Sequence, residues 1–231
     1  MTGLIVALDT TDIAQARSWA DATASSCEML KLGLEFFAAN GPGGVRALGN
    51  GEKIFLDLKL HDIPNTVAGA VRALLPLRPR LLTLHAAGEA AMIRAARAAA
   101  DAAGDARPRL LAVTVLTSIE STLSEIMLRA EMAMAAGADG VVCSGHELRA
   151  LRELLGDDAL LVAPGIRPAG SAADDQARTV TPRAAAAAGA DWIVVGRPIT
   201  RADNPAQAAS AIAAELASTP SPLVGVGRGG G

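Results

Sequence analysis

The feature that most constrains the fold is an alternation, repeated eight times, of short apolar runs with Ala-rich segments. Short apolar runs bounded by turn residues predict buried strands, and the Ala-rich segments suit helix interiors. The expected strands are residues 4–9, 29–33, 53–58, 81–85, 109–116, 139–144, 160–163 and 191–195, and the expected helices are residues 12–24, 35–48, 64–75, 89–103, 121–136, 146–155, 182–188 and 205–217. Eight such pairs predict an α/β fold, a (β/α)8 barrel; an open doubly wound sheet is the competing fold.

Length and composition fit one barrel. The chain has 231 residues, of which 51% are hydrophobic and only 2% aromatic, with no Tyr. The core must therefore be built from Ala, Leu, Val and Ile. We expect residues 1–218 to form a single catalytic barrel domain and the Gly-rich residues 219–231 to form a flexible tail.

The charge balance narrows the range of partners. The formal net charge is −3 and no block of basic residues occurs, which argues against nucleic acid and anionic membranes as partners. A small anionic substrate is compatible with this balance, because a few local Lys and Arg side chains suffice to bind it. The first residues lack a basic region and a long apolar run, so we expect no signal peptide, no membrane span and a cytoplasmic location. Cys27 and Cys143 have no metal-binding spacing, and no disulfide is expected.

Three charged residues interrupt the apolar stretch 55–66: Asp57, Lys59 and Asp62. Because side chains alternate along a strand, Asp57 and Lys59 should point to the same side. Burying charges costs several kcal/mol unless they are paired, so this pattern needs a reason. A structural ion pair at a strand end is one interpretation, and a catalytic acid–base array is the other.

Chemically distinctive residues also lie at the ends of other expected strands, where the active site of a (β/α)8 barrel is built. These residues are Asp9, Lys31, His85, Thr117, Ser118, Ser144, Arg167 and Arg197. Asp9, Lys31, Asp57 and Lys59 would face one cavity as alternating charges, which favours the catalytic interpretation. His85 has no evident partner and is interpreted as a structural or supporting residue.

Two segments near the end of the chain are candidates for phosphate binding. In residues 194–199, Gly196 would let the backbone approach an anion and Arg197 would add a charge-assisted contact; a turn with a solvated Arg is the alternative. Residues 163–178 form a long Gly/Pro-rich loop, which suggests a lid over the substrate with Arg167 and Gln176 as its ligands. No His or carboxylate group shows a recognisable metal-binding spacing.

These residues resemble the orotidine 5′-phosphate decarboxylase family, and the resemblance covers nearly the whole chain. The matching segments are Val6–Asp9, Lys31–Gly33, Asp57–Thr66, Val113–Ser118, Pro164–Pro168 and Val195–Pro198. The run Asp-x-Lys-x-x-Asp-Ile-Pro-Asn-Thr is the most specific part. The shorter pattern Asp-x-Lys-x-x-Asp also fits sugar-phosphate enzymes on the same fold.

The resemblance implies a cofactor-free decarboxylation of orotidine 5′-phosphate to UMP and carbon dioxide, within de novo pyrimidine synthesis. It implies that Lys59 is the proton donor, that Asp57 lies near the departing carboxylate and that Lys31 holds the charges together. The implied substrate contacts are Asp9 and Lys31 to the ribose, Thr117 to the pyrimidine region, and Arg167, Gln176, Gly196 and Arg197 to the phosphate. It further implies a homodimer in which Asp62, Ile63 and Thr66 reach into the partner's site.

Two alternatives remain open at this point. A metal-dependent sugar-phosphate lyase or synthase on the same barrel would share Asp57, Lys59 and Asp62 but would need a divalent ion. A non-catalytic nucleotide-binding protein is the second alternative, and the intact pair of Asp57 and Lys59 argues against it.

Overall fold

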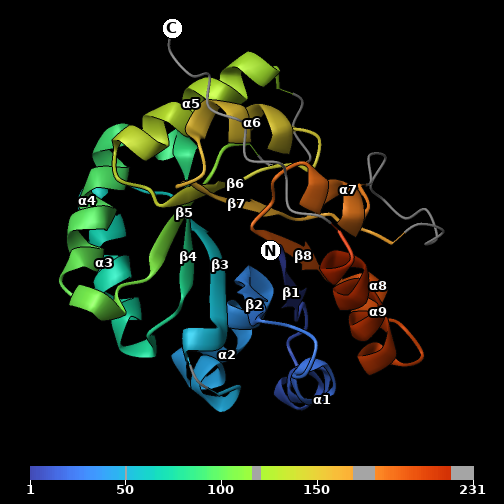
Figure 1. Cartoon of the computed structure of the whole chain (residues 1–231). Helices are drawn as coiled ribbons and strands as arrows, with labels where there is room; N and C mark the ends of the chain where they lie inside the picture. Colours follow the sequence, from blue (N-terminus) through green and yellow to red (C-terminus); the bar gives the residue numbers. More distant parts are fainter. Residues whose placement is uncertain (50, 116–120, 169–179, 220–231) are drawn as a thin grey trace, which may run out of the picture.

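The computed structural model describes residues 1–49, 51–115, 121–168 and 180–219. Eight parallel strands close into a barrel in the order β1 to β8, so that β8 pairs with β1 (Figure 1). The strands are β1 Gly3–Ala7, β2 Met29–Gly33, β3 Ile54–Leu60, β4 Leu81–His85, β5 Arg109–Val113, β6 Gly140–Val142, β7 Leu160–Ala163 and β8 Trp192–Val195. The predicted (β/α)8 barrel is confirmed, and the open doubly wound sheet is excluded.

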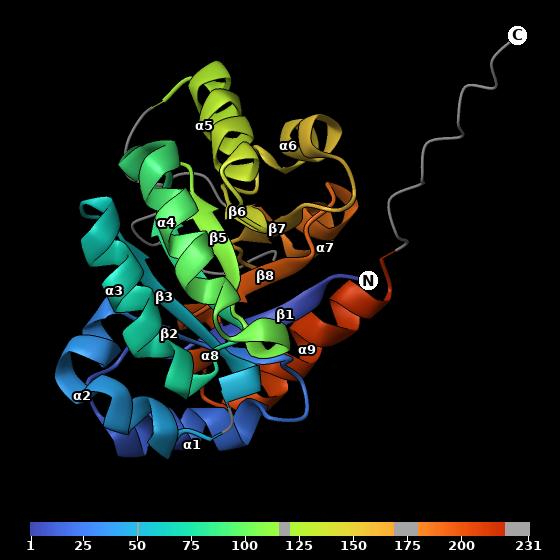
Figure 2. The ribbon, with the colours of Figure 1, turned by 90° about the vertical axis from the view of Figure 1, so that its left-hand side faces the viewer.

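The helices surround the strands, as the two orthogonal views show (Figures 1 and 2). They are α1 Ile13–Thr23, α2 Leu34–Ala47, α3 Pro64–Leu74, α4 Glu89–Asp101, α5 Leu123–Ala135, α6 Leu148–Leu155, α7 Pro182–Ala187, α8 Arg197–Thr200 and α9 Pro205–Ala217. Short 3₁₀ helices cover Gly51–Lys53, Leu75–Leu77, Ala86–Gly88 and Gly104–Ala106. The predicted tail lies mostly outside the described residues, and its boundary stays a prediction.

Helices begin where the sequence supplies capping groups. The Asp12 carboxylate accepts from the N–H of Ala14 at 2.7 Å, at the start of α1. Thr122 and Glu125 form a reciprocal capping box at the start of α5. A proline, which needs no amide hydrogen in the first turn, opens α3, α7 and α9. These local signals explain why the predicted helix starts were close to the observed ones.

Several predicted boundaries were wrong by a few residues. β1 ends at Ala7 rather than at Asp9, β5 ends at Val113 rather than at Leu116, and β3 continues to Leu60. Strand ends depend on pairing with neighbouring strands, which a single run of residues does not reveal. The short helix α8 was not predicted, because four residues are too few to show a helical period.

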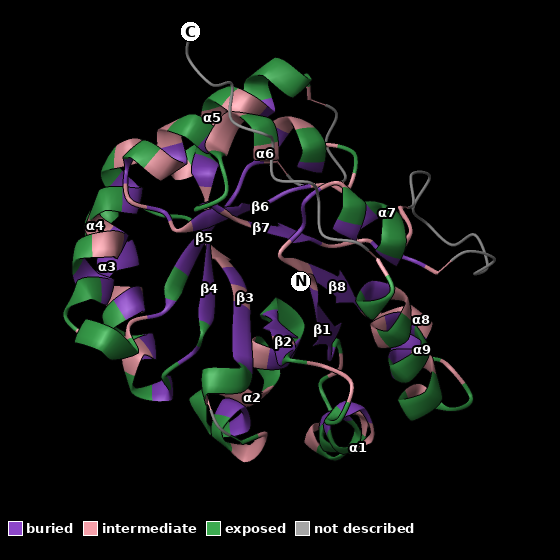
Figure 3. Cartoon of the chain, viewed as in Figure 1, coloured by how far each residue is buried: buried purple, intermediate pink, exposed green. Residues whose placement is uncertain are grey.

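The barrel interior is filled by side chains from every second strand residue. This inner cluster consists of Ile5, Ala7, Met29, Phe55, Leu81, Leu111, Val113, Val142, Val162 and Val194. The intervening residues face the helices and join the larger outer core, so the strands are buried on both sides (Figure 3). The same parity, continued toward the carboxyl ends, leads to Asp9, Lys31, Asp57 and Lys59. The charged side chains therefore lie directly above the apolar inner cluster, at the carboxyl end of the barrel.

A repeated sequence secures the opposite end of the barrel. The run Ala-Ala-Gly-Ala-Asp occurs at residues 135–139 and again at 187–191. The Asp139 carboxylate accepts from both terminal nitrogens of Arg107, at 2.8 and 2.7 Å, and from the N–H of Leu110 at 2.8 Å. Asp191 accepts from one terminal nitrogen of Arg152 and from the N–H of Leu161, both at 2.7 Å. Each carboxylate thus ties the strand it precedes to the strand before it.

We expect Asp139→Asn to lower the free energy of unfolding by about 3 kcal/mol at neutral pH, because it removes the charge of a buried carboxylate that pairs with the partly buried Arg107. Burial alone would raise the pKa of Asp139, but the hydrogen bonds from Arg107 and Leu110 and the Arg107 charge hold it below its usual value. A carboxyl group whose pKa is lower in the folded state than in the unfolded state stabilises the fold at pH values above its unfolded pKa. The stabilisation by Asp139 should therefore disappear as the pH falls through its folded pKa. Urea unfolding at several pH values measures it.

The exposed Asp158 provides the matched control for that experiment. Asp158→Asn should change the free energy of unfolding by less than about 0.5 kcal/mol. Equal, small effects of both substitutions would contradict the role given to Asp139.

Candidate active site

Four charged side chains form a continuous chain of ion pairs at the carboxyl ends of β1, β2 and β3. We call Asp9, Lys31, Asp57 and Lys59 the charge array. Lys31 Nζ lies 3.2 Å from Asp9 Oδ1 and 3.5 Å from Asp57 Oδ2. Lys59 Nζ lies 2.8 Å from each of the two Asp57 oxygens. The array therefore alternates in sign, as the sequence predicted.

The four side chains of the array differ in how far they are exposed to solvent. The Asp57 and Lys31 side chains are each 12% exposed, that of Lys59 is 31% exposed and that of Asp9 is 58% exposed. Burial alone would raise the pKa of Asp57, but the charges of Lys31 and Lys59 and the hydrogen bonds from Lys59 and Thr83 outweigh it and lower the pKa. Asp57 is therefore an anion at neutral pH, fixed between two cations.

The backbone at Lys59 departs from a regular strand. Its φ is 49°, in the left-handed region that residues with a side chain rarely adopt, and the register between β3 and β4 shifts between Leu56 and Leu60. The prediction that Asp57 and Lys59 point the same way assumed a regular strand, and β3 is not regular at Lys59. The two side chains do meet, but across an irregularity that turns Lys59 toward Asp57. Strained backbone of this kind is found preferentially at functional sites.

The residues predicted to serve a partner subunit lie apart from the charge array of their own chain. Asp62, Ile63 and Thr66 are all exposed, and Ile63 retains 66% of its surface. The Asp62 carboxylate accepts from the N–H of Ile63 at 2.7 Å. Among the described residues, the ion pairs of the array do not extend to Asp62. An exposed isoleucine beside an exposed carboxylate is available to a second chain.

The predicted phosphate end lies next to the array. A Cβ built on Gly196, which directly precedes α8, would lie 3.5 Å from Ala7 Cβ and 3.7 Å from Asp9 Oδ2. The end of β8 therefore adjoins the end of β1, and Arg197 begins α8 at this point. Arg167 is 8% exposed, and its N–H donates to Val180 O at 3.1 Å. The other two predicted ligands, Thr117 and Gln176, lie outside the described residues.

Sequence reasoning missed two residues at this site. Gly33 leaves room for the Lys31–Asp9 pair, since a Cβ there would lie 3.3 Å from Lys31 Nζ. Thr83 is fully buried and bonds to both Asp57 and Lys59. The parity of β4 could have pointed to Thr83, because it lies two residues after Leu81 and two before His85.

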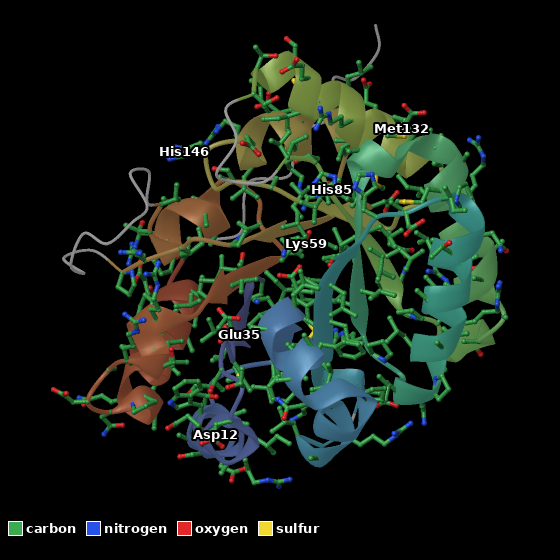
Figure 4. All side chains as sticks on the ribbon, turned by 180° about the vertical axis from the view of Figure 1, so that it is seen from behind. Asp12, Glu35, Lys59, His85, Met132 and His146 are labelled. Atoms are coloured by element: carbon green, nitrogen blue, oxygen red, sulfur yellow. The ribbon has the colours of Figure 1, made fainter. Side chains whose placement is uncertain are left out.

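His85, for which the sequence shows no evident partner, has two partners in the structure. Its ring stacks on that of His61, with 5.3 Å between centroids, and its Nδ1 accepts from the N–H of Ala87 at 3.1 Å. Figure 4 shows His85 and Lys59 near the centre of the strands, and the exposed His146 at the periphery. The pairing depends on the contact between β3 and β4, which residue types alone did not reveal.

We expect the imidazole of His85 to titrate below its ordinary range. Burial is the main cause of this lowered pKa, followed by the nearby charges of His61, Arg129 and Lys59, and protonation would also break the Nδ1 bond to Ala87. His61→Gln should move the pKa upward while leaving it low, because burial remains. A histidine NMR titration measures both, and an unchanged pKa in His61→Gln would contradict the coupling.

Comparison with known proteins identifies the family. Residues 2–212 match the model of the orotidine 5′-phosphate decarboxylase / HUMPS family. The chain belongs to this family. This orotidine 5′-phosphate decarboxylase / HUMPS family member is 54% identical to the orotidine 5′-phosphate decarboxylase of Gluconobacter oxydans (strain 621H), a match that covers 94% of this chain and 98% of the relative. It is 48% identical to the enzyme of that name from Thermobifida fusca (strain YX), over 94% and 96% of the two chains.

A solved structure agrees with the family assignment. The crystal structure of orotidine 5′-phosphate decarboxylase from Lactobacillus acidophilus superposes on this family member with a TM-score of 0.80 at 37% identity, and covers 94% of this chain and 99% of its own. The family predicted from sequence motifs is therefore confirmed. In the part of the chain that the structure describes, no helix is long and apolar enough to span a membrane.

Proposed function

We propose that this chain decarboxylates orotidine 5′-phosphate to UMP and carbon dioxide, and that the charge array is its catalytic centre. The observation that carries the proposal is the alternating, partly buried sequence Asp9–Lys31–Asp57–Lys59 at one end of the barrel. Relatives about half identical to this chain bear the decarboxylase name, which favours this carboxy-lyase over a metal-dependent sugar-phosphate lyase.

The reaction needs what Lys59 offers. When the bond between the pyrimidine carbon and the carboxylate breaks, carbon dioxide leaves and the electron pair stays on the ring carbon, without a conjugated group to accept it. A fixed ammonium beside that carbon stabilises the developing negative charge, and its proton then completes the product. A lysine ammonium is compact and can give up its proton, which an arginine does poorly. Solvent then returns the proton to Lys59.

Asp57 holds this ammonium in place, and Lys31 holds Asp57 from its other side. Asp57 contacts Lys59 through both carboxylate oxygens and contacts Lys31 through one of them. In the proposed complex, Asp57 lies near the departing carboxylate, and its negative charge disfavours the bound substrate more than the product that has lost carbon dioxide. Asp9, the most exposed member of the array, and Lys31, which pairs with it, contact the ribose.

The phosphate would occupy the neighbouring part of the mouth. Gly196 lets the backbone approach an anion, and Arg197 and Arg167 supply positive charge beside it. Gln176 at the phosphate and Thr117 at the pyrimidine complete the proposed contacts. Binding energy from a phosphate distant from the reacting carbon can be used to close the site and lower the barrier.

We also propose a homodimer in which Asp62, Ile63 and Thr66 complete the partner's site. Support comes from their exposure and from their place directly after β3, the strand that carries Asp57 and Lys59. As a biosynthetic enzyme acting on a phosphorylated nucleotide, the protein is proposed to work in the cytoplasm without a cofactor.

Mixing two inactive variants tests the shared sites. Lys59→Ala and Asp62→Ala remove residues that, on this proposal, serve one site from different chains. After random reassociation, about a quarter of the sites should again hold both residues, because every mixed dimer regenerates one intact site. Activity should recover to that fraction in the mixture. No recovery, under conditions in which subunit exchange is demonstrated, would contradict the shared site.

The activity itself is tested by identifying the product. Purified protein incubated with orotidine 5′-phosphate in D₂O should yield UMP with deuterium at the carbon that lost the carboxylate. A sugar-phosphate lyase would leave the nucleotide unchanged.

A further inference from the structure

Thr83 occupies the centre of the proposed site without belonging to the charge array. It lies on β4 with 0% of its surface exposed. It stands two residues after the inward-facing Leu81, so it lies on the same, inner face of the strand. A hydroxyl in this position needs hydrogen-bond partners, since a buried polar group without them is destabilising.

Both partners of Thr83 belong to the charge array. Its Oγ1 accepts from the backbone N–H of Lys59 at 2.8 Å and donates to Asp57 Oδ1 at 3.1 Å. Asp57 Oδ1 also accepts from Lys59 Nζ at 2.8 Å. The hydroxyl thus links the main chain of Lys59 to the carboxylate that holds the side chain of Lys59.

The backbone that Thr83 supports is the irregular part of β3. Lys59 has a φ of 49°, and the register to β4 shifts around it. In a regular ladder the N–H of a strand residue bonds to a neighbouring carbonyl, whereas here it is satisfied by a side chain. Without the hydroxyl, this N–H would lose its partner at a place where the conformation is already unfavourable.

We propose that Thr83 is a positioning residue for the decarboxylation, which fixes the Lys59 ammonium and the Asp57 carboxylate relative to each other through one hydroxyl. This inference rests on the proposed function. The hydroxyl does not touch the substrate; it determines where the proton donor lies. Small displacements of a reacting group reduce rate much more than they reduce substrate binding.

The test compares Thr83→Val, which keeps the shape and removes the hydroxyl, with Thr83→Ser, which keeps the hydroxyl. We expect Thr83→Val to lower kcat for orotidine 5′-phosphate by about 10- to 100-fold. KM and the Kd for UMP should stay within about threefold, because the lost interaction matters in the transition state. Thr83→Ser should recover kcat to within about threefold of wild type, because its hydroxyl can make the same two bonds.

Thr23→Val is the matched control for loss of a buried hydroxyl. Thr23 is also 0% exposed, and its Oγ1 donates to Trp19 O at 2.8 Å within α1, away from the carboxyl ends of the strands. This variant should lower the melting temperature and leave kcat unchanged. If Thr83→Val does not fold, Thr83→Ala removes the same hydroxyl and is judged by the same criteria.

Three results would overturn the inference: a kcat of Thr83→Val within about twofold of wild type, a loss in Thr83→Ser equal to that in Thr83→Val, or a loss carried by KM alone. Failure of the wild-type protein to convert orotidine 5′-phosphate is a separate result, because it rejects the proposed function before any variant is compared.

Discussion

Replacing Lys59 by alanine is expected to abolish nearly all turnover of orotidine 5′-phosphate while UMP still binds. The change removes both the cation that stabilises the developing carbanion and the proton that quenches it, so kcat should fall by about 10⁴-fold or more. UMP lacks the departing carboxylate, and on this proposal the site holds it by its ribose and its phosphate. Its Kd should therefore change far less than kcat. The loss of substrate absorbance gives the rate, and calorimetry gives the Kd.

A lysine at the other end of the same strand is the control. Lys53 is exposed and ends the 3₁₀ helix that precedes β3. Lys53→Ala should keep the wild-type kcat. A loss of turnover in Lys59→Ala would then not be explained by the removal of a positive charge alone. Substantial residual turnover in Lys59→Ala would remove Lys59 from the role of proton donor.

Replacing Arg197 by alanine is expected to raise the barrier for the phosphorylated substrate by about 2–5 kcal/mol, on the order of a lost charge-assisted contact. Each 1.4 kcal/mol corresponds to about tenfold in kcat/KM, so the loss should be at least about 25-fold. Arg197 begins α8 directly after Gly196, beside the end of β1, so its proposed contact is with the phosphate and not with the reacting carbon.

The nucleoside orotidine separates this role from a general defect. It lacks the phosphate, so its much slower conversion should be the same in wild type and Arg197→Ala. Arg201→Ala, which changes an exposed arginine just beyond α8, should match wild type with both substrates. An unchanged rate of Arg197→Ala with orotidine 5′-phosphate would contradict phosphate binding by this residue.

Strand parity explains how much of the fold and the site could be predicted. The strands Met29–Gly33, Leu81–His85 and Leu160–Ala163 were predicted with their observed bounds, because each is a short apolar run between clear breaks. The convergence of the charge array also followed from sequence, since carboxyl ends of parallel strands meet at one end of a barrel. Local pattern was sufficient wherever each strand could be treated separately.

Features that depend on the match between two strands were not predictable in this way. Alternation along β4 places Thr83 on the inner face of the barrel. Only the register of β4 against β3, however, brings its hydroxyl to Asp57 and Lys59. The stack of His61 on His85 has the same origin. The left-handed backbone at Lys59 also has no local signal, because no glycine marks it.

The most direct test of the central claim is the ultraviolet absorbance of orotidine 5′-phosphate mixed with the wild-type protein after dialysis against a metal chelator. If the charge array acts as proposed, the substrate absorbance disappears, UMP and carbon dioxide form in equal amounts, and the chelator leaves the rate unchanged. A stable absorbance, or one that falls only after a divalent ion is added, would contradict a cofactor-free decarboxylase built on Lys59 and Asp57.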